Sequence, residues 1–173
     1  MPNVLARFDN AKRRRPEDHA RQVMLTPEYV LAPIRQLFGG RIGLDPCTES
    51  DNPTNAERFY CLPQDGCDLP WDATTVFVNP PYGEVRDRWV ERCISEGRQR
   101  KVILLMPSHT DTRTSQKALT ACRSVLFVKG RIKYGVKREN GRQMAASHGS
   151  ALFGFGVDLS SLRRLGKVLK PCW

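Results

Sequence analysis

The sequence lacks the features of membrane-spanning and secreted proteins. No apolar run approaches the ~20 residues needed to cross a bilayer, and residues 1–22 contain no apolar core like that of a signal peptide. The composition, 40% hydrophobic and 27% charged residues in a chain of 173, also excludes collagen, coiled coils and wholesale disorder. We therefore expect a cytoplasmic globular protein without a membrane partner.

Closely spaced metal ligands are also missing. None of the six cysteines forms a C-x-x-C pair, and His19, His109 and His148 stand far apart in the chain. Structural zinc sites usually show close ligand pairs, so we expect no metal and reduced, mostly buried thiols.

Acidic residues are scarce in the second part of the chain. Residues 97–173 hold 16 Lys and Arg against 3 Asp and Glu, a balance of +13, whereas residues 1–96 hold 12 against 15, a balance of −3. A field of this size attracts polyanions, so nucleic acid is the expected partner; the alternative is a solvated basic face that only aids solubility. We interpret residues 1–22 as a basic N-terminal arm, either flexible or ordered on binding, ahead of one folded domain over 23–173.

Apolar runs alternate with helical periodicities along the chain. Continuous apolar strands alternating with helices are typical of an α/β fold with a mostly parallel sheet and helices on both faces; the last two strands can pair antiparallel. Thr26 is the expected N-cap of the first helix. The strands are expected at 41–45, 74–78, 101–106, 124–128 and 151–155, the helices at 27–38, 55–60, 85–96, 115–122 and 160–169, and a mobile loop at 129–150.

The most informative residues come directly after predicted strands. In open α/β sheets, ligands bind outside the carboxyl ends of the strands. The segments at 45–46, 79–82 and 108–112 should therefore converge on one crevice.

The segment Asn79-Pro80-Pro81-Tyr82 carries the strongest chemical signal. Two prolines fix the backbone and remove two N–H donors, which leaves carbonyl oxygens, an amide and an aromatic ring. The Asn79 oxygen and the Pro80 carbonyl can accept both hydrogens of an amino group on a planar ligand, and Tyr82 can stack on its ring. Accepting both hydrogens aims the nitrogen lone pair at an electrophile.

This segment resembles the (D/N/S)PP(Y/F/W) signature of amino-group methyltransferases that use S-adenosylmethionine. Further motifs follow in the order of the phage-type N6-adenine DNA methyltransferases, short enzymes encoded by bacteriophages and prophages, and the resemblance covers residues 26–155. It implies a reduced Rossmann-like methyltransferase domain that transfers a methyl group to the N6 amine of a flipped-out adenine. In chain order, the motifs are Thr26-Pro27, Leu44-Asp45-Pro46-Cys47, Asn52, Asn55, Phe59-Tyr60, Asp65-Gly66, Trp71, Val78-Asn79-Pro80-Pro81-Tyr82-Gly83, Trp89, Met106-Pro107, Thr110-Asp111-Thr112 and Gly130-Arg131-Ile132-Lys133-Tyr134.

The resemblance implies a role for each group of residues. The catalytic pocket would be Asn79, Pro80, Pro81 and Tyr82. The cofactor-binding residues would be Thr26, Pro27, Asp45, Pro46, Cys47, Asn52, Asn55 and Asp65. Contacts to DNA would come from Thr110, Asp111, Thr112, Arg131, Lys133, Lys137, Arg138 and Arg142.

Two departures from the family's pattern bear on the cofactor site. Thr48, Glu49 and Ser50 stand where glycines usually follow the Asp-Pro-Phe motif, and the spacing from Asp45 to Asn79 is too short for two further βα units. Asn52 and Asn55 can equally be turn residues, and Asp65 or Asp68 can be either a ribose ligand or a solvated turn carboxylate. The alternatives to adenine methylation are methylation of cytosine N4 or a glutamine amide, or an inactive DNA-binding relative.

Overall fold

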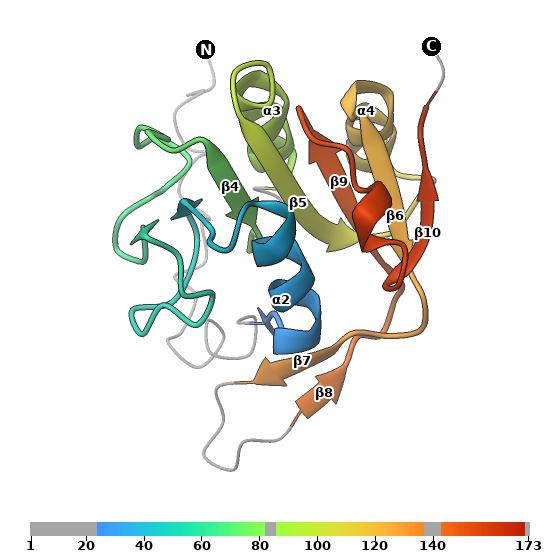
Figure 1. Ribbon diagram of the computed structural model, residues 1–173, viewed down its shortest axis with the longest axis horizontal. Coiled ribbons are helices and arrows are strands. Elements are labelled where there is room, and N and C mark those ends of the chain that lie inside the picture. The colour runs from blue at the N-terminus through green and yellow to red at the C-terminus, as the bar shows by residue number, and fades with distance from the viewer. Residues whose placement is uncertain (1–23, 82–85, 137–142, 172–173) are drawn as a thin grey trace, which may run out of the picture.

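The structure, a computed structural model, describes residues 24–81, 86–136 and 143–171. Its main element is a seven-stranded sheet in the order β10-β6-β9-β5-β4-β2-β3 (Figure 1). The strands are β2 (Leu44–Asp45), β3 (Arg58–Phe59), β4 (Thr75–Val78), β5 (Lys101–Pro107), β6 (Ser124–Val128), β9 (Ser150–Phe155) and β10 (Gly166–Leu169). β3, β2, β4 and β5 are parallel neighbours, whereas β9 runs antiparallel to both β5 and β6 and β10 runs antiparallel to β6.

Helices cover both faces of this sheet, as the continuous apolar strands predict. α3 (Arg86–Glu96) and α4 (Arg113–Ala121) lie on one face, and α2 (Glu28–Leu37) and the short 3₁₀ helix η2 (Ser160–Leu162) lie on the other (Figure 1). Alternate strand residues supply the two cores, because successive side chains of a strand point to opposite faces. Val76 and Val78 pack with Trp89 of α3, whereas the intervening Phe77 packs with Ile34 of α2. The predicted α/β fold is confirmed.

A second, three-stranded sheet lies at the end of the molecule where β4 and β5 finish. It has the order β1-β7-β8 and consists of β1 (Met24–Leu25), β7 (Lys133–Val136) and β8 (Gln143–Ala145). Met24 pairs with Val136 and Leu25 with Gly135. The basic segment at 129–150, expected to be a mobile loop, therefore contributes two antiparallel strands, of which β7 pairs with β1; its residues 137–142 lie outside the described part.

Three local predictions are wrong. The chain at 160–169 forms η2 and then β10, because Gly166 comes so close to β6 that a Cβ would lie 2.0 Å from the Phe127 carbonyl oxygen, an approach that only glycine permits. The chain at 55–60 contributes the strand β3 instead of a helix. Helix α2 begins one residue later than expected, with Pro27 and not Thr26 at its N-cap.

The predicted arm at 1–22 lies outside the described residues, so its boundary with the folded domain stays a prediction. Within the described ranges, every helix is too short or too polar to cross a bilayer. The antiparallel pairing of the strands at 124–128 and 151–155 is confirmed.

Candidate active site

A cavity of about 400 Å³ opens where β2 and β4 end, beside β1. Parallel strands bring these two carboxyl ends to the same edge of the sheet, and Leu44 pairs directly with Val76. Of the residues predicted for the site, those lining this cavity are Thr26, Asp45, Pro46, Cys47, Asp65, Asn79, Pro80 and Pro81. The expected convergence of the segments at 45–46 and 79–81 is therefore present in the structure.

The Asn79 side chain has a defined orientation at the cavity wall. Its Nδ2 donates one hydrogen bond to the Met24 carbonyl oxygen at 2.7 Å and another to Thr26 Oγ1 at 3.1 Å. Both amide hydrogens are thus bound by the segment that enters helix α2. No hydrogen bond from another described residue reaches Asn79 Oδ1, so this oxygen is the part of the amide left to accept a hydrogen from a ligand.

Asp45 presents a buried carboxylate at the end of β2. Only 2% of the residue is exposed, and its two oxygens accept hydrogen bonds from the Cys47 backbone N–H at 3.1 Å and from Thr54 Oγ1 at 2.8 Å. Burial raises the pKa of Asp45 to about 6, although both hydrogen bonds favour the ionised form. At neutral pH the group is an anion held at a fixed place beside the cavity. Burial next to Asp45 also raises the pKa of the Cys47 thiol.

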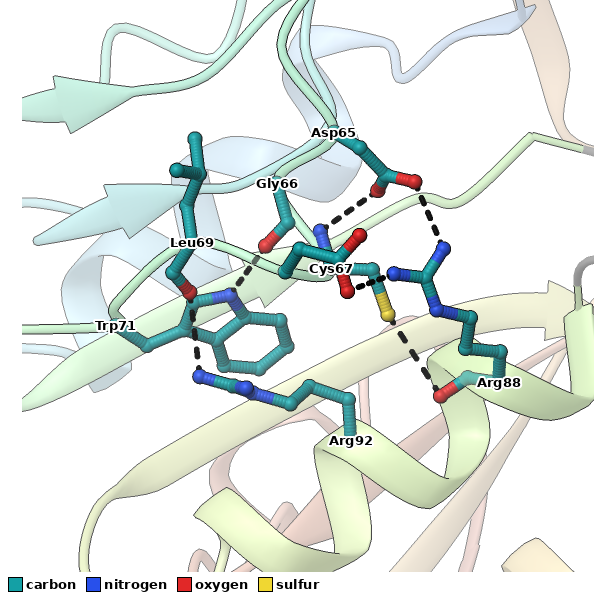
Figure 2. Close-up of polar contacts among 8 residues, drawn as sticks. Asp65, Gly66, Cys67, Leu69, Trp71, Arg88 and Arg92 are labelled. Carbon is teal, nitrogen blue, oxygen red and sulfur yellow. Dashed lines mark hydrogen bonds and ion pairs between the residues drawn. The ribbon is translucent and has the colours of Figure 1, made fainter.

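A glycine from a later loop packs against the turn after Asp45. A Cβ on Gly66 would lie 1.7 Å from the Pro46 carbonyl oxygen, so no side chain fits at this position. The Gly66 carbonyl oxygen in turn accepts a hydrogen bond from Trp71 Nε1 at 2.8 Å (Figure 2). The close approach that a glycine-rich turn after Asp45 would supply comes here from residue 66, in the loop that forms the opposite wall of the cavity.

The same loop is fixed to helix α3 by charged groups. Asp65 accepts hydrogen bonds from the Cys67 backbone N–H at 3.0 Å and from the Arg88 guanidinium at 2.7 Å, and Arg88 also pairs with Asp68 (Figure 2). These contacts lower the pKa of the Asp65 carboxyl below its usual value against the opposing effect of burial. Asp65 lines the cavity, but Arg88 and the loop backbone already engage both of its oxygens.

A second arginine of α3 clamps the rest of this loop. Arg92 donates to the Leu69 carbonyl oxygen at 3.2 Å and stacks over the Trp71 ring at 5.3 Å from its centroid (Figure 2). Cation–π contacts of this kind add to the burial of the ring. The loop at 65–71 is thus held against α3, and its first two residues, Asp65 and Gly66, line the cavity.

Three residues predicted to bind the cofactor are not among the described residues that line the cavity. Asn52 uses its amide within its own turn, accepting from the Ala56 N–H at 3.1 Å and donating to the Ala56 carbonyl at 3.0 Å. Asn52 and Asn55 both have positive φ angles, 47° and 52°, which asparagine tolerates better than most residues. These contacts are those of the turn alternative, and Pro27 is the N-cap of α2.

The predicted DNA-contacting residues that the structure describes follow β5 and β6, at the same edge of the sheet. Thr110 and Asp111 are exposed after β5, and Thr112 caps helix α4 by accepting a hydrogen bond from the Ser115 N–H. Arg131 and Lys133 are exposed, whereas the residues that alternate with them are buried. Tyr82, Lys137, Arg138 and Arg142 lie outside the described residues.

Sequence reasoning missed three participants. Thr54 hydrogen bonds to Asp45, Gly66 packs on Pro46, and Arg88 holds the cavity wall. Thr54 and Arg88 stand in none of the family motifs. Asp65-Gly66 is among those motifs, but it indicates a turn without indicating what the turn packs against.

Comparisons with known proteins give a family match and a similarity to a solved structure. A family profile described as DNA N-6-adenine-methyltransferase (Dam) matches residues 14–161. The chain also resembles the crystal structure of a SAM-dependent O-methyltransferase from Thermotoga maritima, with a TM-score of 0.46, 7% sequence identity, and coverage of 79% of this chain and 68% of that one. The chain matches no curated protein.

Proposed function

Since the chain belongs to the DNA N-6-adenine-methyltransferase (Dam) family, we propose that Asn79 and Pro80 hold the N6 amino group of an adenine that has left the DNA stack. The supporting observation is the orientation of the Asn79 amide, whose two hydrogens are bound by Met24 and Thr26. Its oxygen is then the acceptor offered to a substrate. An amino group is a donor that this oxygen and the Pro80 carbonyl can bind together.

S-adenosylmethionine is the methyl donor of this family, and the cavity beside Asn79 fits such a group. A volume of about 400 Å³ lies within the range of 300–1,000 Å³ that is typical of small-molecule sites. Asp45 would accept hydrogen bonds from the cofactor's polar groups, and the Pro46–Gly66 contact would set the shape of the wall. When bound, the cofactor would supply a methyl group on a sulfonium centre, an electrophile for nitrogen; the sulfur–methyl bond would break as the methyl group is transferred, and the cofactor would leave as a neutral thioether.

The protein's contribution is to position the amine and to stabilise charge. Asn79 Oδ1 and the Pro80 carbonyl would each accept one amino hydrogen, so the nitrogen lone pair is drawn out of conjugation with the purine ring. As the nitrogen–methyl bond forms, positive charge develops on nitrogen, and the two fixed oxygens offset it. The proton then leaves to water. The rest of the rate enhancement would come from holding amine and methyl group in contact.

The adenine amine of a duplex is buried in the base stack, so the proposal includes base flipping. Extrusion costs a few kcal/mol, and stacking on an aromatic ring returns about 1–3 kcal/mol. Tyr82 is the residue we propose for this stacking. A duplex carrying 2-aminopurine at the target position should become more fluorescent when the protein and a non-reactive cofactor analogue are added. Unchanged fluorescence of this probe, when the matching duplex with adenine at the same position is methylated, would contradict extrusion of the base.

The decisive test of the activity is nucleoside analysis of methylated DNA. The full chain is incubated with methyl-labelled S-adenosylmethionine and unmethylated DNA, and the DNA is then digested to nucleosides. Label in N6-methyl-2′-deoxyadenosine is the expected result. Label in N4-methyl-2′-deoxycytidine would show that cytosine, and not adenine, is the substrate. No label in DNA, together with no cofactor binding in calorimetry, would identify an inactive DNA-binding relative.

A further inference from the structure

The edge of the sheet that carries Asn79 continues to a group of exposed cations on the far side. Lys129 follows the end of β6, and Arg163 and Arg164 precede β10. We call these three residues the β6–β10 corner. All three are exposed, and none forms an ion pair with a residue that the structure describes. The neighbouring carboxylate of Asp158 is occupied by Lys170 at 2.6 Å.

The backbone holds these cations together. The Lys129 N–H donates to the Leu165 carbonyl oxygen at 2.9 Å, and the Leu165 N–H donates to the Leu162 carbonyl oxygen at 2.8 Å. Next to them, Gly166 passes so close to β6 that it admits no side chain. The three charges therefore stand on a fixed support, which lowers the entropic cost of using them together.

The corner lies at the same edge of the sheet as the candidate active site. β6 is antiparallel to β9, which is antiparallel to β5, so β6 ends on the same side as β4 and β5 (Figure 1). In the strand order, β6 is three positions from β4 and β10 is four positions from it. At ~4.8 Å per strand spacing, these positions lie about 14 and 19 Å from β4. The cofactor cavity, at β2, lies on the other side of β4.

We propose that the β6–β10 corner binds backbone phosphates of the DNA about four to six base pairs from the target adenine, on one side of it only. The distance follows from the strand spacing and from a rise of ~3.4 Å per base pair. Unpaired arginine and lysine side chains on a fixed support are suited to phosphates, which they bind without reading sequence. This inference rests on the proposed function for the identity of the polyanion.

The test compares two variants that each remove three positive charges. The first is Lys129→Gln/Arg163→Gln/Arg164→Gln. The matched control, Arg98→Gln/Lys101→Gln/Arg123→Gln, removes exposed cations at the opposite edge, where β5 and β6 begin. Duplexes of 24 base pairs with a fixed target adenine are used for binding, and unchanged melting temperatures establish that both variants fold.

The corner variant should bind the 24-base-pair duplex at least tenfold more weakly at 0.1 M salt. The slope of the logarithm of its binding constant against the logarithm of the salt concentration should be smaller in magnitude by about 2–3. The control variant should bind within twofold of wild type. Trimming the duplex to three base pairs on one particular side of the adenine should weaken the wild type and leave the corner variant unaffected. Trimming the other side should affect both proteins equally.

Equal losses in the corner and control variants would overturn the proposal, because net charge alone would then explain the effect. A corner defect that persists on a duplex trimmed on both sides would also overturn it. Methylation at saturating DNA is measured in parallel. If the wild type methylates no DNA, the proposed function fails, whereas the binding comparison still decides whether the corner contacts phosphates.

Discussion

The two sides of the active-site edge use their charged residues differently. Around the cavity, cations are tied to the protein itself: Arg88 pairs with Asp65 and Asp68, and Arg92 pairs with Glu96 at 2.8 Å. Beyond β5, in the part of the chain that the structure describes, exposed cations such as Arg131, Lys133 and those of the β6–β10 corner have no ion-pair partner.

This difference indicates two roles for the charged residues: those near the cavity fix the cavity wall, and those beyond β5 supply affinity for a polyanion. The ion pair between Arg88 and Asp65 fixes two residues of the cavity wall, so these charges already have partners within the protein. The unpaired cations beyond β5, namely Arg131, Lys133 and the β6–β10 corner, are called the rim below. They raise the local electrostatic potential and attract a polyanion, an effect that depends on salt concentration. Substitutions near the cavity should therefore change catalysis, cofactor binding or stability without changing the salt dependence of DNA binding. Substitutions at the rim should do the reverse.

The substitution Asn79→Ala is expected to show the largest difference between its effect on catalysis and its effect on DNA binding. The variant loses the oxygen that we propose stabilises positive charge on the amine, and removing one such preorganised group typically lowers kcat by 10²–10³-fold. DNA affinity should stay within twofold of wild type, since the rim is untouched. Steady-state methylation and fluorescence anisotropy with a labelled duplex measure the two quantities. Gln99→Ala, an exposed amide at the opposite edge, should leave both unchanged. Turnover of Asn79→Ala near the wild-type rate would remove Asn79 from the mechanism.

The raised pKa of Asp45 predicts that the free energy of unfolding depends on pH, an effect that comes from the cavity and not from the rim. Its pKa of about 6 in the folded protein exceeds the ordinary value of 3.8, so the folded state holds the proton more tightly than the unfolded state. The stability that this proton contributes is fully present below pH 3.8 and is lost as the pH rises through 6. Integrated over this window, the loss is about 3 kcal/mol at most.

The comparison for this effect is Asp45→Asn. The neutral amide can still accept from the Cys47 N–H and can donate to Thr54 Oγ1. Urea unfolding of the cofactor-free protein between pH 4 and pH 7 should therefore show wild type losing stability relative to the variant as the pH rises. Parallel curves for the two proteins would contradict a buried carboxyl of raised pKa. DNA binding by the rim should follow the same pH profile in both.

Gly66→Ala tests whether the loop at 65–71 sets the shape of the cavity. The added methyl group would meet the Pro46 carbonyl oxygen at 1.7 Å, and neither backbone segment can yield without moving the cavity wall. Overpacking of this kind costs about 1–3 kcal/mol. Calorimetry should show weaker binding of S-adenosylmethionine, and the melting temperature should fall.

Gly135→Ala is the graded control for this effect. There the new Cβ would lie 3.3 Å from the Leu25 Cβ, so a shift of a few tenths of an ångström accommodates it. Its melting temperature should fall less than that of Gly66→Ala. If both variants bind cofactor like wild type, the Pro46–Gly66 contact does not shape the site.

The division between the two sides also explains which features the sequence predicts well. Strands β4, β5, β6 and β9 are buried on both faces, so each appears in the sequence as a continuous apolar run. Such a run can be recognised without knowing which strands lie beside it. The residues that follow such strands must gather at one edge, which is why Asp45 and Asn79 could be placed beside the same crevice.

The features that were missed depend on contacts distant in sequence. Leu162, Leu165 and Val168 recur every three residues and so fit a helix, but backbone pairing with β6 makes this segment a strand. At the start of β7, the exposed Lys133 lies between the buried Ile132 and Tyr134, an alternation visible in the sequence, but the partner strand β1 lies about 110 residues earlier. Sequence patterns report local periodicity and give no information about such partners.

The smallest effect is expected at Thr26, where the same sequence motif supports two different roles. The resemblance to the family assigns Thr26 to the cofactor site. In the structure only 9% of Thr26 is exposed, and its hydroxyl oxygen accepts a hydrogen bond from Asn79 Nδ2. Thr26→Val keeps the shape and removes this acceptor. One hydrogen bond contributes about 1 kcal/mol, so we expect kcat to fall about fivefold as the amide loses its fixed orientation.

The pattern of constants distinguishes the two roles of Thr26. A residue that only orients Asn79 should change kcat and leave the KM for S-adenosylmethionine and the Kd for DNA unchanged, and Thr26→Ser should restore kcat because it keeps the hydroxyl. A residue that binds the cofactor should instead raise the KM for S-adenosylmethionine. Since β1 joins Thr26 to β7, whose exposed Lys133 belongs to the rim, a change in DNA affinity in Thr26→Val would show that the two sides of the edge are mechanically coupled and not separate.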